Sequence, residues 1–341
     1  MDEKKELTRG EQLRRALTYQ KKNGYDRLQP GELEAIEAYC SGYKQFLDGG
    51  KTERECVDRT IALAETAGFR PYVRGMELKP GDKVYQSNRG KAVMLAVIGR
   101  KDLDQGVNIG AAHIDSPRLD LKQNPVYEAE ELAFFKTHYY GGIRKYQWGT
   151  MPLAIHGVFS RADGTTVSVN VGEDENDPVF CITDLLPHLG AEQGERKLSD
   201  GIRAEELNIL IGSDAVDDEE VKAAVKLNTM ILLNEKYGIT EKDFARAEIE
   251  IVPAYKSRDV GFDRSMIGAY GHDDRVDAYP ALMAEIATKN PAFTTVCVLT
   301  DKEEIGSDGV TGMQSMYVFH FMQLLCRAAG QDDILAFRTR V

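Results

Sequence analysis

The chain has 341 residues, of which 42% are hydrophobic and 29% charged, a balance typical of globular rather than disordered proteins. Its 55 acidic residues outnumber 43 basic ones, and the net charge of −12 argues against a nucleic acid or an anionic membrane as the main partner. The charged amino terminus has no apolar segment typical of a signal peptide, and no apolar run approaches the roughly 18 residues that span a bilayer, so we expect a cytoplasmic protein.

The five cysteines are widely spaced, odd in number and never arranged as a Cys-x-x-Cys pair. We therefore expect neither a disulfide framework nor a thiolate zinc site. Cys297 and Cys326 lie in apolar runs and are predicted to pack in the core.

Helices are predicted first along the chain, and strands follow them. Residues 30–49 begin with proline and end with glycine, the order expected for a helix. Residues 52–68 open with the capping box Thr-Glu-Arg-Glu and are predicted to form a second helix that stops at a glycine. The short apolar runs at 92–98 and 107–112 predict two buried strands.

The middle of the chain has a different pattern. Residues 166–171 and 247–252 alternate apolar with polar side chains, which predicts half-exposed antiparallel strands. Between them we expect a polar loop at about 190–218. A helix at about 221–237, capped by Gly238, is predicted to follow the loop.

We interpret residues 120–262 as a smaller β-rich domain inserted into the first domain, which then consists of 1–119 and 263–341. The remaining predicted elements are helices at 277–289 and 316–329 and a strand at 293–300. His320 lies in an apolar part of the last helix, so we expect it in the core rather than at a metal.

Two adjacent glutamates, Glu303 and Glu304, follow the predicted strand at 293–300. Proteins of the α/β class place active sites at the carboxyl ends of strands. Adjacent carboxylates repel each other, and a divalent metal would hold them there, with one as ligand and the other as base. Taken alone, the segment could equally be a solvated acidic turn.

Two further segments carry suitable side chains. His113 follows the predicted strand at 107–112 and can bind a metal, while Asp115 can orient its ring. Asp273 and Asp274 precede a predicted helix, where a carboxylate can bridge two cations, although an aspartate N-cap is the common alternative. One imidazole and several carboxylates without a thiol suit a two-metal hydrolytic site with zinc, cobalt or manganese.

Four segments together resemble the aspartyl aminopeptidase/aminopeptidase I family of dinuclear zinc exopeptidases. In chain order they are Ala111-Ala-His-Ile-Asp-Ser-Pro117, Trp148-Gly-Thr-Met-Pro-Leu-Ala-Ile-His156, Gly271-His-Asp-Asp-Arg275 and Asp301-Lys-Glu-Glu-Ile-Gly-Ser307. The resemblance runs from about residue 80 onward. It implies an α/β fold in which helices flank a mixed sheet, an inserted β-rich domain that serves oligomerisation, and a cytoplasmic homo-oligomer.

The resemblance also implies a role for each matching residue in binding metal. His113 resembles the ligand of one zinc ion and Glu304 that of the other. Asp273 resembles the aspartate that bridges them, with Asp274 as the alternative. Asp115 resembles the carboxylate that supports the metal-binding histidine. Co²⁺ or Mn²⁺ are the alternative metals.

For catalysis, Glu303 resembles the general base that activates water. His156 resembles a histidine that reaches into a neighbouring subunit's site and helps to bind substrate or to stabilise the transition state. The implied reaction is release of acidic or neutral amino-terminal residues from peptide substrates, with Glu303, Asp115 and His156 as the catalytic set.

The family pattern implies two more ligands, an aspartate and a histidine, from segments well after Glu304. No segment between Glu304 and Val341 resembles them, so we expect a truncated form. The alternative is a non-catalytic member that acts as a partner subunit or is an inactive fragment. A serine hydrolase has little support, because Ser116 lies beside His113 and Asp115 in sequence and a triad needs spatial convergence.

Overall fold

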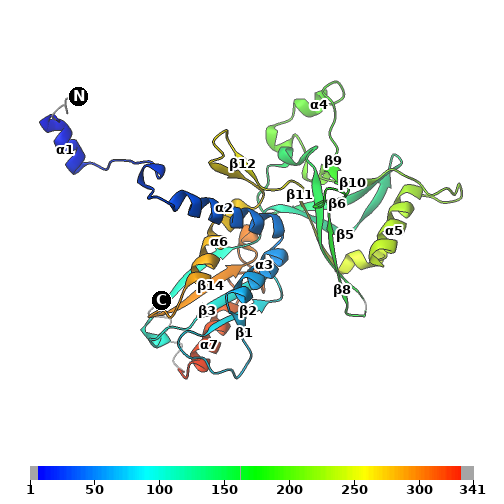
Figure 1. The fold of residues 1–341 in the computed structure, drawn as a ribbon. Helices are drawn as coiled ribbons and strands as arrows, with labels where there is room; N and C mark the ends of the chain where they lie inside the picture. Colours follow the sequence, from blue (N-terminus) through cyan, green and yellow to red (C-terminus); the bar gives the residue numbers. More distant parts are fainter. Residues whose placement is uncertain (1–6, 162, 332–341) are drawn as a thin grey trace. The chain divides into compact units, whose positions relative to one another are not determined.

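The structure is a computed structural model that describes residues 7–161 and 163–331. Residues 1–43 form one unit and the remainder of the chain another (Figure 1). The first unit contains helix α1 (Arg9–Leu17) and most of α2 (Glu32–Gly49). Within the described ranges, no helix is long and apolar enough to cross a lipid bilayer.

A mixed sheet of five strands, called the first sheet below, belongs to the second unit. In spatial order its strands are β1 (Arg70–Pro71), β2 (Lys83–Asn88), β3 (Ala92–Val97), β14 (Thr294–Thr300) and β4 (Val107–His113). Strand β14 is antiparallel to β3 and parallel to β4, with Thr300 opposite His113. The carboxyl ends of β4 and β14, far apart in sequence, therefore meet at one edge of the sheet.

Helices cover both faces of the first sheet (Figure 1). Helix α7 (Tyr317–Ala328) packs its apolar side against a cluster that includes Val298 of β14. Because side chains alternate along a strand, Cys297 points to the opposite face. On that face lie α6 (His272–Ala287) and α3 (Glu53–Thr66). The central strands β3 and β14 are therefore buried, whereas Asn108 to Ala111 of the edge strand β4 remain exposed.

A second, antiparallel sheet of seven strands is built from the middle of the chain. In spatial order its strands are β8 (Thr166–Val171), β7 (Leu153–Ser160), β11 (Ala247–Pro253), β5 (Arg118–Ala129), β6 (Leu132–Tyr140), β10 (Ile209–Gly212) and β9 (Cys181–Ile182). The short α4 (Ala191–Gly194) precedes β10, and β12 (Arg258–Val260) and β13 (Met266–Gly268) pair separately.

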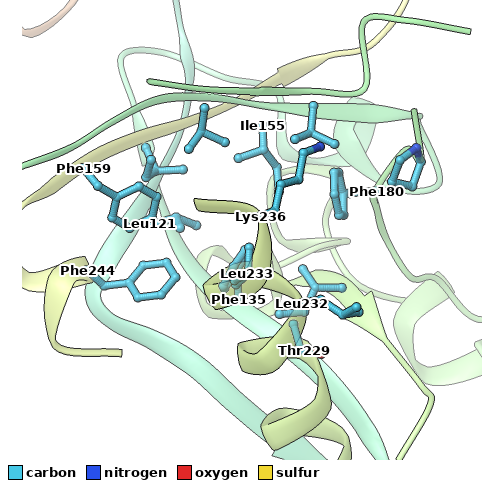
Figure 2. A pocket seen from close by; sticks show the side chains of 15 residues that line it. Leu121, Phe135, Ile155, Phe159, Phe180, Thr229, Leu232, Leu233, Lys236 and Phe244 are labelled. Atoms are coloured by element: carbon cyan, nitrogen blue, oxygen red, sulfur yellow. The ribbon is translucent and has the colours of Figure 1, made fainter. Parts of the chain in front are cut away.

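Helix α5 (Ala224–Tyr237) packs on the second sheet over a partly filled apolar core. A cavity of about 200 Å³ remains there, lined by aromatic rings such as Phe135 and Phe244 and by Leu233 of the helix (Figure 2). Lys236 is the one charged side chain among its lining residues within the described part of the chain. Atoms that face such a space lose dispersion contacts, so packing is looser beneath α5 than in a filled core.

Most of the predicted elements are confirmed. The confirmed helices are α2, α3, α5, α6 and α7, and strands form as predicted at β3, β4, β8, β11 and β14. The burial expected of two of these strands is wrong: β4 is exposed at 108–111 rather than buried, and β11 is buried at 249–253 rather than half-exposed. The capping box at Thr52 is present, and Gly238 caps α5 in the left-handed conformation. Cys297 and Cys326 are buried as predicted. The boundaries of an inserted domain at 120 and 262 stay a prediction.

Two further expectations, on a loop and on a histidine, are wrong. The predicted loop at 190–218 contains β10, whose short apolar run pairs with β6 and β9. His320 is exposed rather than in the core, because α7 is amphipathic and this residue lies on its outer side.

Glu285 is a carboxyl group buried beneath the first sheet. This α6 residue is 5% exposed and accepts a hydrogen bond from Thr295 Oγ1 at 3.1 Å. Burial raises the pKa of Glu285 to about 7, despite the opposing effects of that hydrogen bond and of the charge on Lys83. The helix-covered face of the first sheet thus adjoins a carboxyl group whose pKa lies near neutral pH.

The raised pKa makes stability depend on pH. Between about pH 4.5 and 7 the folded state retains a proton that the unfolded state has lost, so the free energy of unfolding falls as pH rises. Above this window ionised Glu285 costs roughly 3 kcal/mol. We expect Glu285→Gln to be more stable than wild type at about pH 8 and nearly equal at about pH 4.5, measured by urea denaturation. Exposed Glu235→Gln is the control, and an equal gain at both pH values would contradict the prediction.

Candidate metal centre

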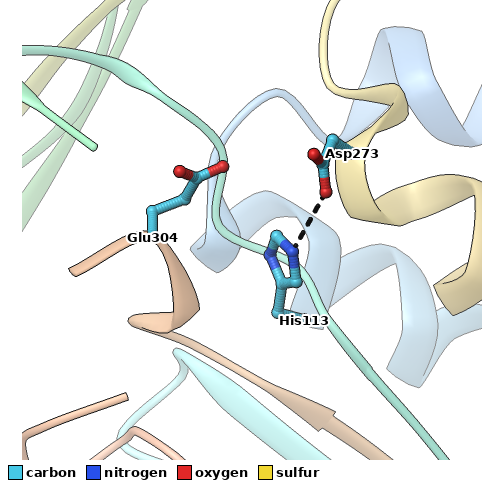
Figure 3. Close-up of side chains that lie close together, drawn as sticks. All are labelled: His113, Asp273 and Glu304. Carbon is cyan, nitrogen blue, oxygen red and sulfur yellow. Dashed lines mark ion pairs between the residues drawn. The ribbon is translucent and has the colours of Figure 1, made fainter. Parts of the chain in front are cut away.

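Three predicted residues converge at the edge where β4 and β14 end. His113 closes β4, Asp273 lies at the start of α6, and Glu304 lies in a short 3₁₀ helix, η7 (Glu303–Ile305), directly after β14. One ligand atom from each lies within 4.8 Å of the others (Figure 3). Segments that are distant in sequence thus supply a single cluster.

His113 has carboxylates on both sides of its ring. Nδ1 lies 3.0 Å from the main-chain oxygen of Asp115 and 3.3 Å from its Oδ1. Nε2 lies 3.2 Å from Asp273 Oδ1 and 3.6 Å from Glu303 Oε2. Burial disfavours the charged ring, but the hydrogen bond and charge of Asp115 raise the pKa of His113 to about 9. The same negative surroundings favour a divalent cation, which would replace the proton at Nε2.

Asp115 joins the end of β4 to η7. Its buried carboxylate accepts the main-chain N–H of Glu303 at 3.2 Å and that of Glu304 at 3.3 Å. The hydroxyl of Tyr140 donates to the same group at 2.7 Å. Burial opposes ionisation, but the hydrogen bonds from His113 and Tyr140 lower the pKa of Asp115. Asp115 is therefore an anion that positions both the histidine and the glutamates.

Asp273 and Asp274, which a cis peptide bond joins, have different partners. The side chain of Asp273 is 87% exposed and reaches His113 Nε2. Asp274 Oδ2 instead accepts the main-chain N–H of His113 at 3.4 Å. Burial and a hydrogen bond with Asp277 raise the pKa of Asp274. This geometry favours Asp273 as the ligand and gives Asp274 a role in holding the end of β4.

Two side chains attach the start of α6 to the segment after β4. Ser116 Oγ donates to the main-chain oxygen of Asp273 at 2.9 Å. The fully buried guanidinium of Arg275 donates to the main-chain oxygens of Ile114 at 3.0 Å and Lys51 at 2.9 Å. The three ligand-bearing segments are therefore fixed to one another by contacts outside the cluster itself.

The side chains present fit a zinc site. Burial, followed by the negative charges of Asp115, Asp273 and Glu303, raises the pKa of Glu304, and a cation would relieve this repulsion. The donors are one imidazole nitrogen and carboxylate oxygens, a set that zinc accepts. Glu303 projects beside them with a side chain that is 57% exposed.

His156, the third predicted catalytic residue, lies outside this cluster. It is buried in β7, with Nδ1 2.7 Å from Glu55 Oε1 and Nε2 3.1 Å from Glu173 Oε1. Burial disfavours the charged ring, but these two carboxylates raise the pKa of His156. Lys51 Nζ lies 2.6 Å from the same oxygen of Glu173. The ring therefore connects α3 to the second sheet.

Sequence reasoning missed Tyr140. A tyrosine at the end of a strand has no local signal that links it to an aspartate 25 positions earlier. The pairing of β5 with β6 would have supplied one, because its register places Tyr140 opposite Arg118, close to the segment of Asp115.

Known proteins are similar to this chain over most of its length. Residues 46–341 match the model of the aminopeptidase I zinc metalloprotease family, M18. The chain belongs to this family. A probable M18 family aminopeptidase 1 of Clostridium acetobutylicum is 51% identical over 321 residues, which cover 93% of this chain and 69% of the relative. One of Thermotoga maritima is 46% identical over 304 residues, which cover 88% and 65%.

Solved structures agree with the M18 assignment. The crystal structure of the M18 aminopeptidase from Thermotoga maritima matches with a TM-score of 0.87 at 43% identity, over 94% of this chain and 70% of that one. Aminopeptidase I from Clostridium acetobutylicum matches with a TM-score of 0.85 at 47% identity, over 94% and 71%. The chain thus spans about two thirds of the length of the M18 relatives that it matches.

We expect His113→Ala and Glu304→Ala each to weaken zinc binding by more than about 100-fold, beyond the effect of removing a group that only supports a ligand. Competition with a chromophoric chelator measures the affinity. His138→Ala is the control, because this histidine is exposed on β6. Unchanged affinity in His113→Ala would remove that residue from the site.

The His156 pairing predicts a pH-dependent effect on stability. A raised pKa means that the charged ring stabilises the fold at low pH and that this contribution is lost as pH rises through the folded-state pKa. His156→Gln keeps a hydrogen-bonding side chain without the charge, so we expect a larger loss of stability at about pH 6 than at about pH 9. Urea denaturation with His138→Gln as control tests this, and an equal loss at both pH values would contradict it.

Proposed function

We propose that this chain is a zinc-dependent aminopeptidase that hydrolyses amino-terminal residues, acidic or neutral, from peptides. The supporting observation is the convergence of His113, Asp273 and Glu304, with Glu303 beside them, in a member of the M18 family. Two zinc ions per site are proposed, with Co²⁺ or Mn²⁺ as alternatives. His113 and Glu304 would each hold one ion, and Asp273 would be shared.

Bound zinc would polarise the scissile carbonyl and lower the pKa of water. The chain's own contribution begins with Asp115. Its carboxylate accepts from Nδ1 of His113, which fixes the tautomer and leaves the Nε2 lone pair facing Asp273. Through the amides of η7, Asp115 also holds the backbone of both glutamates.

Glu303 is proposed as the general base. Its carboxylate is more than half exposed and faces His113 Nε2 at 3.6 Å, so it borders both solvent and the ligand cluster. From there it can take a proton from the attacking water and pass it to the leaving amine. The carboxylate of Glu303 is thereby regenerated for the next turnover.

A cleft of about 720 Å³ beside Asp273 is the proposed substrate site. It is lined by apolar and aromatic side chains such as Trp148 and Met151, and by the charged side chain of Arg144. The aromatic lining suits neutral residues, and the guanidinium suits acidic ones. A free α-amino group needs a carboxylate or a metal nearby, and a site beside this cluster supplies it, which favours cleavage from the amino end.

We also propose a cytoplasmic homo-oligomer. Within residues 179–198 several large apolar side chains are more than half exposed, namely Val179, Leu185, Leu186, Leu189 and Leu198. Exposed apolar side chains that gather in one region mark interaction surfaces. In such an assembly His156 keeps its predicted role in substrate binding or transition-state stabilisation, alongside its pairing with Glu55 and Glu173.

Replacing the base tests the mechanism. We expect Glu303→Gln to lower kcat by about 10²- to 10⁴-fold while zinc content stays unchanged, because glutamine cannot accept the proton. Chromogenic aspartyl, glutamyl and leucyl anilides report activity, and inductively coupled plasma mass spectrometry reports zinc. Exposed Glu219→Gln is the matched control.

The possible results distinguish the role of Glu303 from the proposed activity of the chain. Full activity in Glu303→Gln would show that Glu303 is not the general base, and the proposed activity would stand. A wild-type chain that binds zinc but cleaves none of the three anilides would overturn the proposed activity and favour a non-catalytic partner subunit.

A further inference from the structure

The second sheet contacts the metal centre at the end of β6. Tyr140, its last residue, is buried and donates its hydroxyl hydrogen to Asp115 Oδ2 at 2.7 Å. The same oxygen accepts the N–H of Glu304 at 3.3 Å, and Oδ1 accepts that of Glu303 at 3.2 Å. Because Asp115 is fully buried, water has little access to replace a lost donor.

The ring of Tyr140 is itself fixed. Its centroid lies 3.9 Å from the guanidinium carbon of Arg118, which faces it in the pairing of β5 with β6. Arg118 Nε lies 2.9 Å from Asp120 and 3.2 Å from Glu250 of β11. Strand register and two ion pairs thus set the direction in which the hydroxyl points.

The next residue touches a proposed ligand. Gly141 has a φ of +71°, and a Cβ atom there would lie 2.9 Å from Glu304 Oε2 and 3.0 Å from its Cβ. A Cβ atom at the neighbouring Gly142 would meet nothing within 4 Å. Of these two neighbouring glycines, Gly141 is therefore the one that lies close to Glu304.

We propose that Tyr140 and Gly141 are positioning residues of the metal centre, through which the second sheet sets the geometry of His113 and Glu304. Tyr140 acts through Asp115, whose carboxylate contacts the imidazole of His113 and accepts hydrogen bonds from the main-chain N–H groups of η7. Gly141 acts by leaving room for the side chain of Glu304. The inference rests on the proposed function, since it concerns how the same metal ligands are held.

Tyr140→Phe removes only the hydroxyl and is the main test. We expect zinc and cobalt affinity to fall roughly 10-fold, as is typical when a group that orients a ligand is lost. The visible absorption spectrum of the Co²⁺ form should change, and kcat should fall with little change in KM. Tyr139→Phe is the matched control, the same substitution one residue earlier in β6 at a side chain that is 46% exposed.

Gly141→Ala and Gly142→Ala form a second pair that does not depend on the first variant folding. Gly141→Ala should shift the Co²⁺ spectrum and weaken cobalt binding, because the new methyl group displaces the Glu304 carboxylate. Gly142→Ala should leave cobalt affinity and spectrum as in wild type. Thermal unfolding of all four variants shows which of them remain folded.

Each result decides a different claim. If the wild-type chain binds neither zinc nor cobalt, the metal site and this inference both fall. If wild type binds metal while folded Tyr140→Phe and Gly141→Ala keep its affinity and spectrum, the inference alone is overturned. A lower melting temperature with unchanged affinity and spectrum would likewise reduce Tyr140 to a packing residue.

Discussion

The parallel pairing of β4 with β14 is the constraint on which the rest of the site depends. With Thr300 opposite His113, the segments that follow both strands leave the first sheet at the same edge. That edge gathers carboxylates whose mutual repulsion would drive them apart in a free peptide. Hydrogen bonds to Asp115 from the amides of η7 hold the backbone, so the side chains are presented together before any cation arrives. Such preorganisation is what binding of a small, strongly charged ion requires.

Buried ion pairs connect the two sheets. Glu53 of α3 is fully buried, and Lys91 Nζ lies 3.0 Å from it, while Arg118 Nη1 lies 3.5 Å away on the side of the second sheet. Burial opposes ionisation of Glu53, but the charges of Arg118 and Lys91 lower its pKa to about 2. Removing several charges from water is costly, so such a cluster contributes little net stability. Its contacts link α3, the segment after β2 and the second sheet at one place, because Glu53 lies between Lys91 and Arg118.

The sequence was informative where the signal is local. Continuous apolar runs revealed β3, β4 and β14, and the residues that follow β4 and β14 identified most of the metal cluster. The hairpin of β5 and β6 was missed for a physical reason. Its turn uses Glu130 and Glu131 with φ of 50° and 59°, where glycine or asparagine would give a recognisable signal. Tyr140 was missed with it, because its partner is defined by register. His156 was found as a motif residue, but its pairing with Glu55 and Glu173 required three segments to be assembled.

The cavity beneath α5 has a consequence for how the second sheet responds to compression. Hydrostatic pressure favours states of smaller volume, and the volume change of unfolding scales with the internal space that unfolding eliminates. The core beneath α5 retains about 200 Å³ that is lined mainly by hydrocarbon. Unfolding of the second sheet would eliminate this space, which adds to the volume decrease that pressure favours.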